Sequence, residues 1–149
     1  MRETMTATQI MLDAHEGQKH GNGPYYLHPR AVAQMLLDLP GFFDLSQREQ
    51  YICYEAALLH DVLEDSEWTA TDLLDAGIDP HVVNTVVILT RTDDVDDDTY
   101  YARIRAHNQA IWVKTADMCH NLSTIVHLSP ARKVKLTTKY AKGMAALHG

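Results

Sequence analysis

Cysteines, basic residues and long apolar runs are all scarce in this sequence. The chain has two cysteines, Cys53 and Cys119, each inside an apolar helical pattern. We therefore expect no disulfide framework and a reducing environment. It contains no run of about 18 apolar residues and no basic-then-apolar start. We therefore expect a cytoplasmic protein with no signal peptide and no membrane contact.

The shortage of basic residues also restricts the partners. Thirteen Lys and Arg stand against 20 Asp and Glu, which gives a net charge of −7 and argues against non-specific binding to nucleic acid or to an anionic membrane. A phosphorylated small molecule is not excluded, because a bound divalent metal and a few local cations can hold a phosphate. The 149 residues, 46% of them hydrophobic, suit one domain spanning 1–149.

Helical periodicity dominates the chain, and strand-like alternation bounded by turn signals is hard to find. The sequence therefore predicts an all-α bundle of about seven to eight helices. Ser46 followed by Glu49, and Thr69 followed by Asp72, resemble capping boxes that open two of them. The expected helices span 4–19, 29–39, 47–64, 69–76, 80–91, 98–107, 108–128 and 131–147.

The stretch ALLHDVLEDSEWT, residues 56–68, places acids on an otherwise apolar helix. At about 100° per residue, His60, Asp61, Glu64 and Asp65 share one polar face of this helix. An ordinary surface helix is the simplest interpretation. However, no Lys or Arg lies within a turn of these acids, and adjacent carboxylates repel one another. A divalent cation would make them tolerable.

His60 and Asp61 supply one nitrogen and one oxygen, which is too few for a mononuclear metal site. Two further candidates stand elsewhere. His28 precedes a proline suited to start a helix, and Asp117 is an acid in a largely apolar helical stretch, which is costly unless it is bonded or ligated. Taken alone, a residue of either kind is more often a capping or core polar residue than a ligand.

Other polar clusters fit known metal motifs poorly. His15, Glu16 and His20 do not form the HExxH zinc motif, because the second histidine stands one residue too far along. The acidic run at 93–98 lacks the central glycine and closing glutamate of a calcium loop, so a solvated loop leading into a helix is the better interpretation. The remaining histidines without a partner pattern, which we expect to be surface or structural, are His81, His107, His127 and His148.

In chain order, His28, His60-Asp61 and Asp117 follow the H…HD…D pattern of the HD phosphohydrolase superfamily. The surrounding blocks are AHEGQKHGNGPYYLHPRAVAQML at 14–36, LLHDVLEDSEWT at 58–69, LLDAGI at 73–78 with LTR at 89–91, and VKTADMCHNLST at 113–124. They resemble successive blocks of the hydrolase domain of RelA/SpoT-type enzymes and of the small alarmone hydrolases. The resemblance extends from about residue 10 to 125 and implies an HD-domain helical bundle.

The resemblance implies a Mn²⁺-dependent hydrolase that removes pyrophosphate from the 3′ position of guanosine tetra- or pentaphosphate. The implied metal ligands are His28, His60, Asp61 and Asp117. By the same resemblance, Glu64 and Asp65 activate the attacking water, and Asn121, Thr124 and Tyr140 contact the nucleotide. Four ligands of this kind leave open metal positions for a water and a phosphate oxygen.

Two positions depart from the family pattern. His20, with Asn22 two residues later, stands where the family has an arginine that stacks on the purine, and imidazole stacks less strongly than guanidinium. Met118 replaces a basic residue after the ligand aspartate. We therefore expect an altered base pocket, in which adenosine alarmones such as (p)ppApp become alternatives.

Two other functions remain open from the sequence. One is a nucleotidase or phosphatase acting on another nucleotide, such as a deoxynucleotide or NADPH. The other is a non-catalytic nucleotide-binding module, which the Glu64-Asp65 pair disfavours because a pure binder needs no water-activating acids. The oligomeric state is not predicted.

Overall fold

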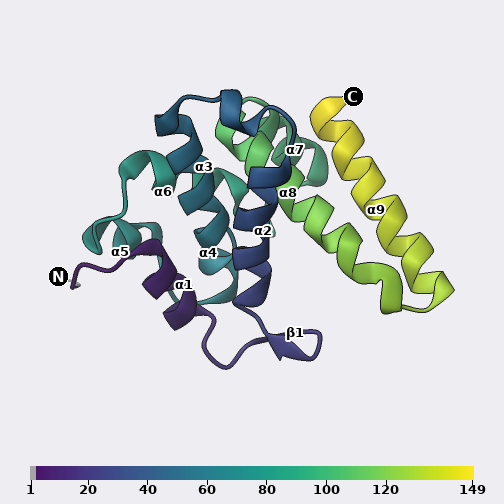
Figure 1. Ribbon diagram of the computed structural model, residues 1–149, viewed down its shortest axis with the longest axis horizontal. Coiled ribbons are helices and arrows are strands. Elements are labelled where there is room, and N and C mark those ends of the chain that lie inside the picture. Colours follow the sequence, from purple (N-terminus) through teal and green to yellow (C-terminus); the bar gives the residue numbers. More distant parts are fainter. Residues whose placement is uncertain (1–2) are drawn as a thin grey trace.

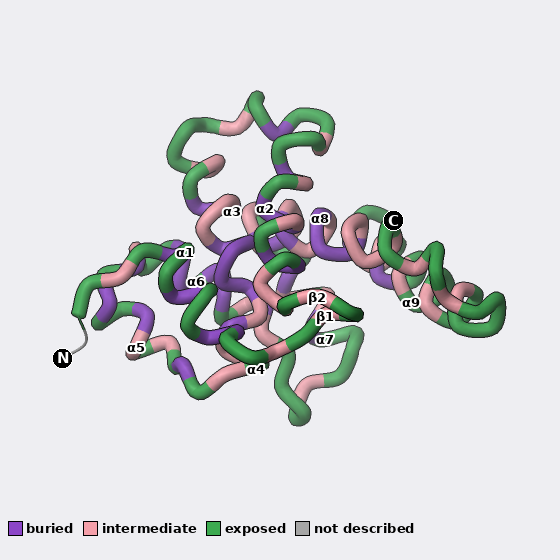
Figure 2. The backbone as a smooth tube through the Cα atoms, turned by 60° about the horizontal axis from the view of Figure 1, so that its bottom comes forward, coloured by how far each residue is buried: buried purple, intermediate pink, exposed green. Residues whose placement is uncertain are grey.

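Helices α2 (Leu27–Asp38), α3 (Gln47–Leu59) and α8 (Asn108–Thr124) pack against one another at the centre of the computed structural model, which describes residues 3–149 (Figure 1). Their inward faces supply much of the buried core (Figure 2). The all-α prediction is confirmed. The other elements are α1 (Ala7–Ala14), β1 (Lys19–His20), β2 (Gly23–Pro24), η1 (Phe42–Asp44), α4 (Val62–Asp65), α5 (Ala70–Asp75), α6 (Pro80–Leu89), α7 (Asp97–Arg105), η2 (Ile125–His127) and α9 (Pro130–His148).

Side-chain caps begin several of these helices as the sequence predicts. The Ser46 hydroxyl accepts from the backbone N–H of Glu49, and Thr69 and Asp72 form a reciprocal capping box. Asp96 caps α7 by accepting from the backbone N–H of Thr99. Each cap satisfies N–H groups that a helix start leaves without a partner. The acidic run at 93–98 is therefore a loop that ends in a helix cap, as expected.

The prediction of one continuous helix at 47–64 is wrong. It ends at Leu59, and α4 begins only at Val62, so the shared polar face expected from a regular helix does not form. The His60 ring explains the break, since its Nδ1 donates to the Ala57 carbonyl at 2.6 Å. In a continuous helix, that carbonyl would instead accept a hydrogen bond from the backbone N–H of Asp61. The break directs His60 and Asp61 toward the same point.

The predicted helix at 4–19 is also too long. It runs only from Ala7 to Ala14, and Gly17 then adopts a left-handed conformation, with φ 77°, that ends the helix. The chain continues into the β1–β2 hairpin, which the helical pattern did not predict. The helix predicted at 108–128 ends at Thr124, where the 3₁₀ turn η2 begins. The other predicted helices lie within two residues of the observed ones.

Helix α9 lies along α7 and α8, where Gly143 permits close approach (Figure 1). A Cβ at Gly143 would lie 2.6 Å from the Met118 sulfur and 2.8 Å from the Tyr101 hydroxyl. Met118 is fully buried at this contact. The expectation that Met118 alters the base pocket is therefore wrong, because this side chain fills the core between α8 and α9.

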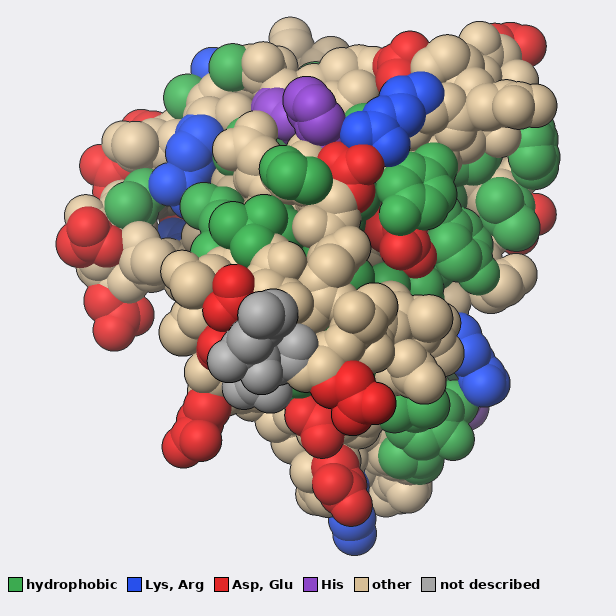
Figure 3. Space-filling view, turned by 90° about the vertical axis from the view of Figure 1, so that its left-hand side faces the viewer, with side chains coloured by type: hydrophobic (Ala, Val, Ile, Leu, Met, Phe, Trp, Pro, Cys, Tyr) green, Lys and Arg blue, Asp and Glu red, His purple; other side chains and the backbone are tan. Residues whose placement is uncertain are grey.

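Within the described part of the chain, every helix is too short or too polar to cross a membrane. Acidic side chains are spread over the face shown in Figure 3, in keeping with the net charge of −7.

Candidate metal centre and nucleotide cavity

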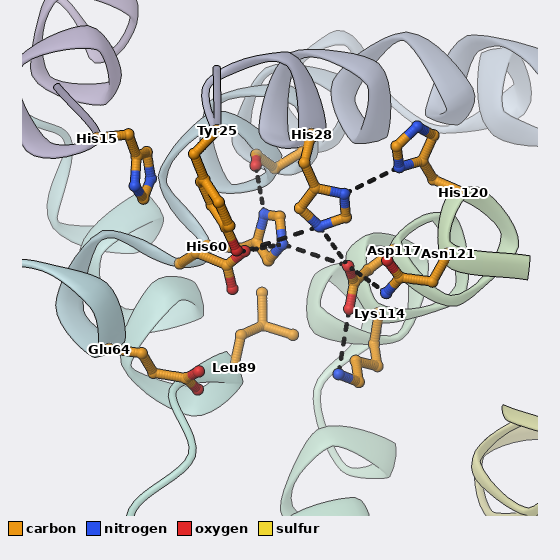
Figure 4. Close-up of polar contacts among 12 residues, drawn as sticks. His15, Tyr25, His28, His60, Glu64, Leu89, Lys114, Asp117, His120 and Asn121 are labelled. Atoms are coloured by element: carbon orange, nitrogen blue, oxygen red, sulfur yellow. Dashed lines mark hydrogen bonds and ion pairs between the residues drawn. The ribbon is translucent and has the colours of Figure 1, made fainter. Parts of the chain in front are cut away.

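Four predicted ligands converge from three parts of the bundle. His28 stands in the first turn of α2, His60 and Asp61 occupy the break between α3 and α4, and Asp117 points inward from α8 (Figure 4). Candidate ligand atoms of His28, His60 and Asp61 all lie within 4.8 Å of one another. Asp117 Oδ1 lies 2.9 Å from Nε2 of His28 and 3.4 Å from Nε2 of His60.

The His60 ring is prepared to bind a cation. Its Nδ1 donates to the Ala57 carbonyl, so the neutral ring leaves a lone pair on Nε2. That nitrogen is buried without a hydrogen-bond partner among residues 3–149, and lies 3.2 Å from Asp61 Oδ2. Two imidazoles and two carboxylates form a donor set that suits a transition-metal dication. The side chains present therefore fit a metal.

The charges of the cluster depend on one another. Burial lowers the pKa of His60, but Asp61 and Asp117 outweigh it and raise that pKa well above its ordinary value. Burial raises the pKa of Asp61, and the neighbouring His60 more than offsets this and lowers it to about 2. Without a metal, a proton on His60 thus balances the carboxylates. A metal ion would have to displace that proton.

We therefore expect metal affinity to fall with falling pH. Because the raised pKa of His60 keeps the ring protonated at higher pH than usual, each pH unit below that pKa should cost about tenfold in metal affinity for one displaced proton. Calorimetric titration in buffers of different ionisation enthalpy measures the released proton directly. An affinity that is the same at pH 6 and pH 8 would refute this.

The two carboxylates are held by further side chains. The Tyr25 hydroxyl donates to Asp61 Oδ2 at 2.6 Å, while Lys114 donates to Asp117 Oδ2 at 3.2 Å and Asn121 to Asp117 Oδ1 at 3.3 Å. Burial opposes the charge on Lys114, but Asp117 raises its pKa and keeps it protonated. Neither Tyr25 nor Lys114 was predicted from the sequence to take part in the site. The only signal for Lys114 was its position three residues before Asp117, on the same helix face.

His120, which was also not predicted to have a role, contacts the candidate ligand His28 through its ring. Their Nδ1 atoms lie 2.9 Å apart, while Nε2 of His28 faces Asp117 (Figure 4). Burial and the nearby His28 lower the pKa of His120, so the Nδ1 of its neutral ring can accept a hydrogen bond from the Nδ1–H of His28. This contact would fix the tautomer that presents Nε2 to a metal.

Replacing His120 by alanine is therefore expected to weaken metal binding about 10–100-fold, the usual effect of losing an outer-shell partner. Isothermal titration with Mn²⁺ measures the change. His120→Asn offers a carboxamide oxygen in place of the ring nitrogen and should recover part of the affinity. Parental affinity in His120→Ala would show that the contact has no such role.

Three of the four candidate ligands, His60, Asp61 and Asp117, line a cavity of about 200 Å³. Glu64 lines it, and its Oε1 accepts from the backbone N–H of Arg91. Partial burial raises the pKa of Glu64, and likewise that of Asp65. Asp65 interacts with Tyr25 rather than lining this cavity. The structure thus separates the two acids, with only Glu64 at the cavity wall.

The residues predicted to contact the nucleotide lie next to this cavity. His20, Asn121, Thr124 and Tyr140 line a second hollow of about 410 Å³, and Asn121 and Tyr140 border both. The His20 ring stacks on His28, with centroids 5.0 Å apart. Asn22 lies exposed in the β1–β2 turn and lines neither hollow. The structure therefore brings four of the five predicted contacts together.

No family model matches the chain, but individual known proteins are similar to it. The chain is 32% identical over 139 residues, 85% of its length, to the guanosine-3′,5′-bis(diphosphate) 3′-pyrophosphohydrolase of Vibrio cholerae serotype O1. Over the same share it is 31% identical to the bifunctional (p)ppGpp synthase/hydrolase SpoT of Escherichia coli K12. It spans only 18% of each relative.

A solved structure matches with a TM-score of 0.74 and 21% identity, covering 96% of this chain and 84% of the other. That structure is of a protein described as a metazoan ortholog of SpoT that hydrolyses ppGpp. The helical fold and the ordered His28, His60-Asp61 and Asp117 set define the class of HD-domain proteins. Together with the curated relatives, they support an HD domain of the RelA/SpoT hydrolase type, as the motif blocks predicted.

Proposed function

We propose that the chain is a metal-dependent phosphohydrolase that removes pyrophosphate from the 3′ position of alarmone nucleotides of the (p)ppGpp type. One observation carries the proposal. Four candidate ligands converge beside a cavity that Glu64 and three cations, Arg91, Lys114 and Lys139, also line. The names of the similar proteins, of which this chain spans a part, support the choice of substrate.

His28, His60, Asp61 and Asp117 would hold the metal, for which the family resemblance suggests Mn²⁺. When bound, such an ion polarises a phosphate oxygen and acidifies water. The chain's own side chains supply the rest of the chemistry. Tyr25 and Lys114 hold the carboxylates in place, which keeps the site preorganised.

Glu64 is the proposed general base. Its Oε1 is engaged by the N–H of Arg91, which orients the carboxylate and leaves the second oxygen free to take a proton from water. Its raised pKa brings its basicity closer to neutral pH. Asp65 reaches Asp61 through their shared partner Tyr25, so we assign it a positioning role.

The reaction balances simply. Water attacks the phosphorus bonded to the ribose O3′, Glu64 accepts the water's proton, and the P–O3′ bond breaks. Pyrophosphate leaves with the water's oxygen and its second proton. The proton taken up by Glu64 returns to O3′ through solvent, so O3′ leaves as a hydroxyl and the carboxylate is regenerated. Arg91, Lys114 and Lys139 line the cavity where negative charge collects on the phosphates, and fixed cations at such a place stabilise the transition state.

The adjoining hollow of His20, Asn121, Thr124 and Tyr140 is the proposed nucleoside site. Imidazole at position 20 offers fewer donors to a purine than guanidinium, so adenosine as well as guanosine substrates belong to the proposal. Asn22, at the exposed turn beside His20, remains a predicted contact. The cytoplasmic location expected from the sequence also stays a prediction.

Product analysis tests the proposal. The Mn²⁺-loaded protein is incubated with guanosine and adenosine 3′-pyrophosphates, deoxynucleoside triphosphates and NADPH, with His60→Ala as the control. Release of 3′-pyrophosphate that the control lacks is the expected result. Cleavage of only the other substrates would replace the proposal by the nucleotidase alternative.

A further inference from the structure

A second groove extends from the metal cavity between α7 and α9. Its basic residues are Arg91, Lys135, Lys139 and Lys142, and we refer to it as the cationic groove. It encloses about 690 Å³ and shares Arg91, Tyr101 and Lys139 with the metal cavity as common walls. An anion leaving the metal cavity on this side enters the groove directly.

The three lysines of the groove lie on one face of α9. Lys135, Lys139 and Lys142 are spaced at i, i+4 and i+7, so their ammonium groups repel one another. All three are exposed. Among residues 3–149, none of them forms a salt bridge. On a chain with net charge −7, this face is a local patch of positive charge that favours the binding of an anion.

The acids that line the groove do not neutralise it. Asp97 and Asp98 stand at the start of α7, and Asp97 pairs with Arg91. Among residues 3–149, Asp98 forms no salt bridge with the lysines, so the four basic residues of the groove outnumber its two acids. Gly143 and Ala146, on the same helix as the lysines, also line the groove and add little side-chain bulk.

We propose that the cationic groove binds inorganic pyrophosphate as it leaves the metal cavity. Pyrophosphate carries several negative charges on two linked phosphates, so it can contact more than one lysine of the row. Its identity as the ligand rests on the proposed reaction, whereas the anion site itself rests on the groove. Since both cavities share Lys139, this residue passes the product from one to the other.

Calorimetric titration of the full chain with sodium pyrophosphate in EDTA tests the site without metal–phosphate contacts. The double variant Lys135→Ala/Lys142→Ala should bind at least fivefold more weakly and show a shallower salt dependence. Lys133→Ala removes the same charge from another face of α9 and should bind as the parent does. Orthophosphate should bind at least fivefold more weakly than pyrophosphate.

Pyrophosphate binding that is absent from the parent, or equal in parent and double variant, would overturn the site. The outcome is separable from that of the proposed function, because this titration involves no turnover. If the lysines determine pyrophosphate binding but the chain hydrolyses no alarmone, the anion site is supported and the proposed reaction is refuted. If the chain is active and the double variant is inhibited by pyrophosphate as strongly as the parent, the proposed pyrophosphate site is rejected while the proposed function is not.

Discussion

Glu64→Gln is expected to lower kcat by about 10²–10⁴, the usual contribution of a general base. The carboxamide keeps the size of the side chain, and its oxygen can still accept from the N–H of Arg91. It cannot take a proton from water at neutral pH. Since Glu64 is not among the candidate ligands, Mn²⁺ affinity and nucleotide KM should change little. Steady-state kinetics and metal titration measure the two effects separately.

Glu67→Gln provides a matched control three residues away. Glu67 is exposed and does not line the metal cavity, so the same change of charge there should leave turnover intact. If Glu64→Gln retained most of the parental kcat, another group would be the base. If it lost the metal instead, Glu64 would be a ligand.

Asp117→Asn is expected to abolish metal binding in the micromolar range. One carboxylate oxygen lies 2.9 Å from His28 Nε2 and 3.4 Å from His60 Nε2, so the amide removes negative charge from the centre of the cluster. The loss should exceed the roughly 10–100-fold effect of outer-shell changes. The variant also leaves the Lys114 ammonium facing a neutral amide, which should lower the free energy of unfolding by about 1–3 kcal/mol.

A second variant separates these two effects. In Asp117→Asn/Lys114→Gln the stranded charge is gone, so thermal stability should return toward that of the parent while metal binding stays lost. Denaturant unfolding and Mn²⁺ titration report the two properties. Parental metal affinity in Asp117→Asn would remove this residue from the ligand set.

The order of His28, His60-Asp61 and Asp117 along the chain predicted the cluster through its resemblance to the HD pattern. The cost of polar groups in apolar helical stretches marked these residues as candidates, but did not by itself assign them as ligands. Helix positions were predictable for a related reason. Caps such as Ser46 and Thr69 depend on residues only three positions away, so they can be predicted from the local sequence.

Contacts between distant elements were not predictable in the same way. The break at His60 follows from a side chain that takes the Ala57 carbonyl, against the regular helical pattern. The pairing of His28 with His120 depends on how α2 and α8 pack, which periodicity does not specify. Met118 looked like a lost cation in the sequence, but packing against Gly143 places it in the core.

The most direct test of the account is a ³¹P NMR time course of guanosine 3′,5′-bis(diphosphate) with the Mn²⁺-loaded protein. We predict inorganic pyrophosphate and guanosine 5′-diphosphate in equal amounts, with the reaction stopped by EDTA and absent in His60→Ala. Release of orthophosphate, loss of the 5′ phosphates, or an unchanged spectrum with metal demonstrably bound would contradict the proposed 3′-pyrophosphohydrolase.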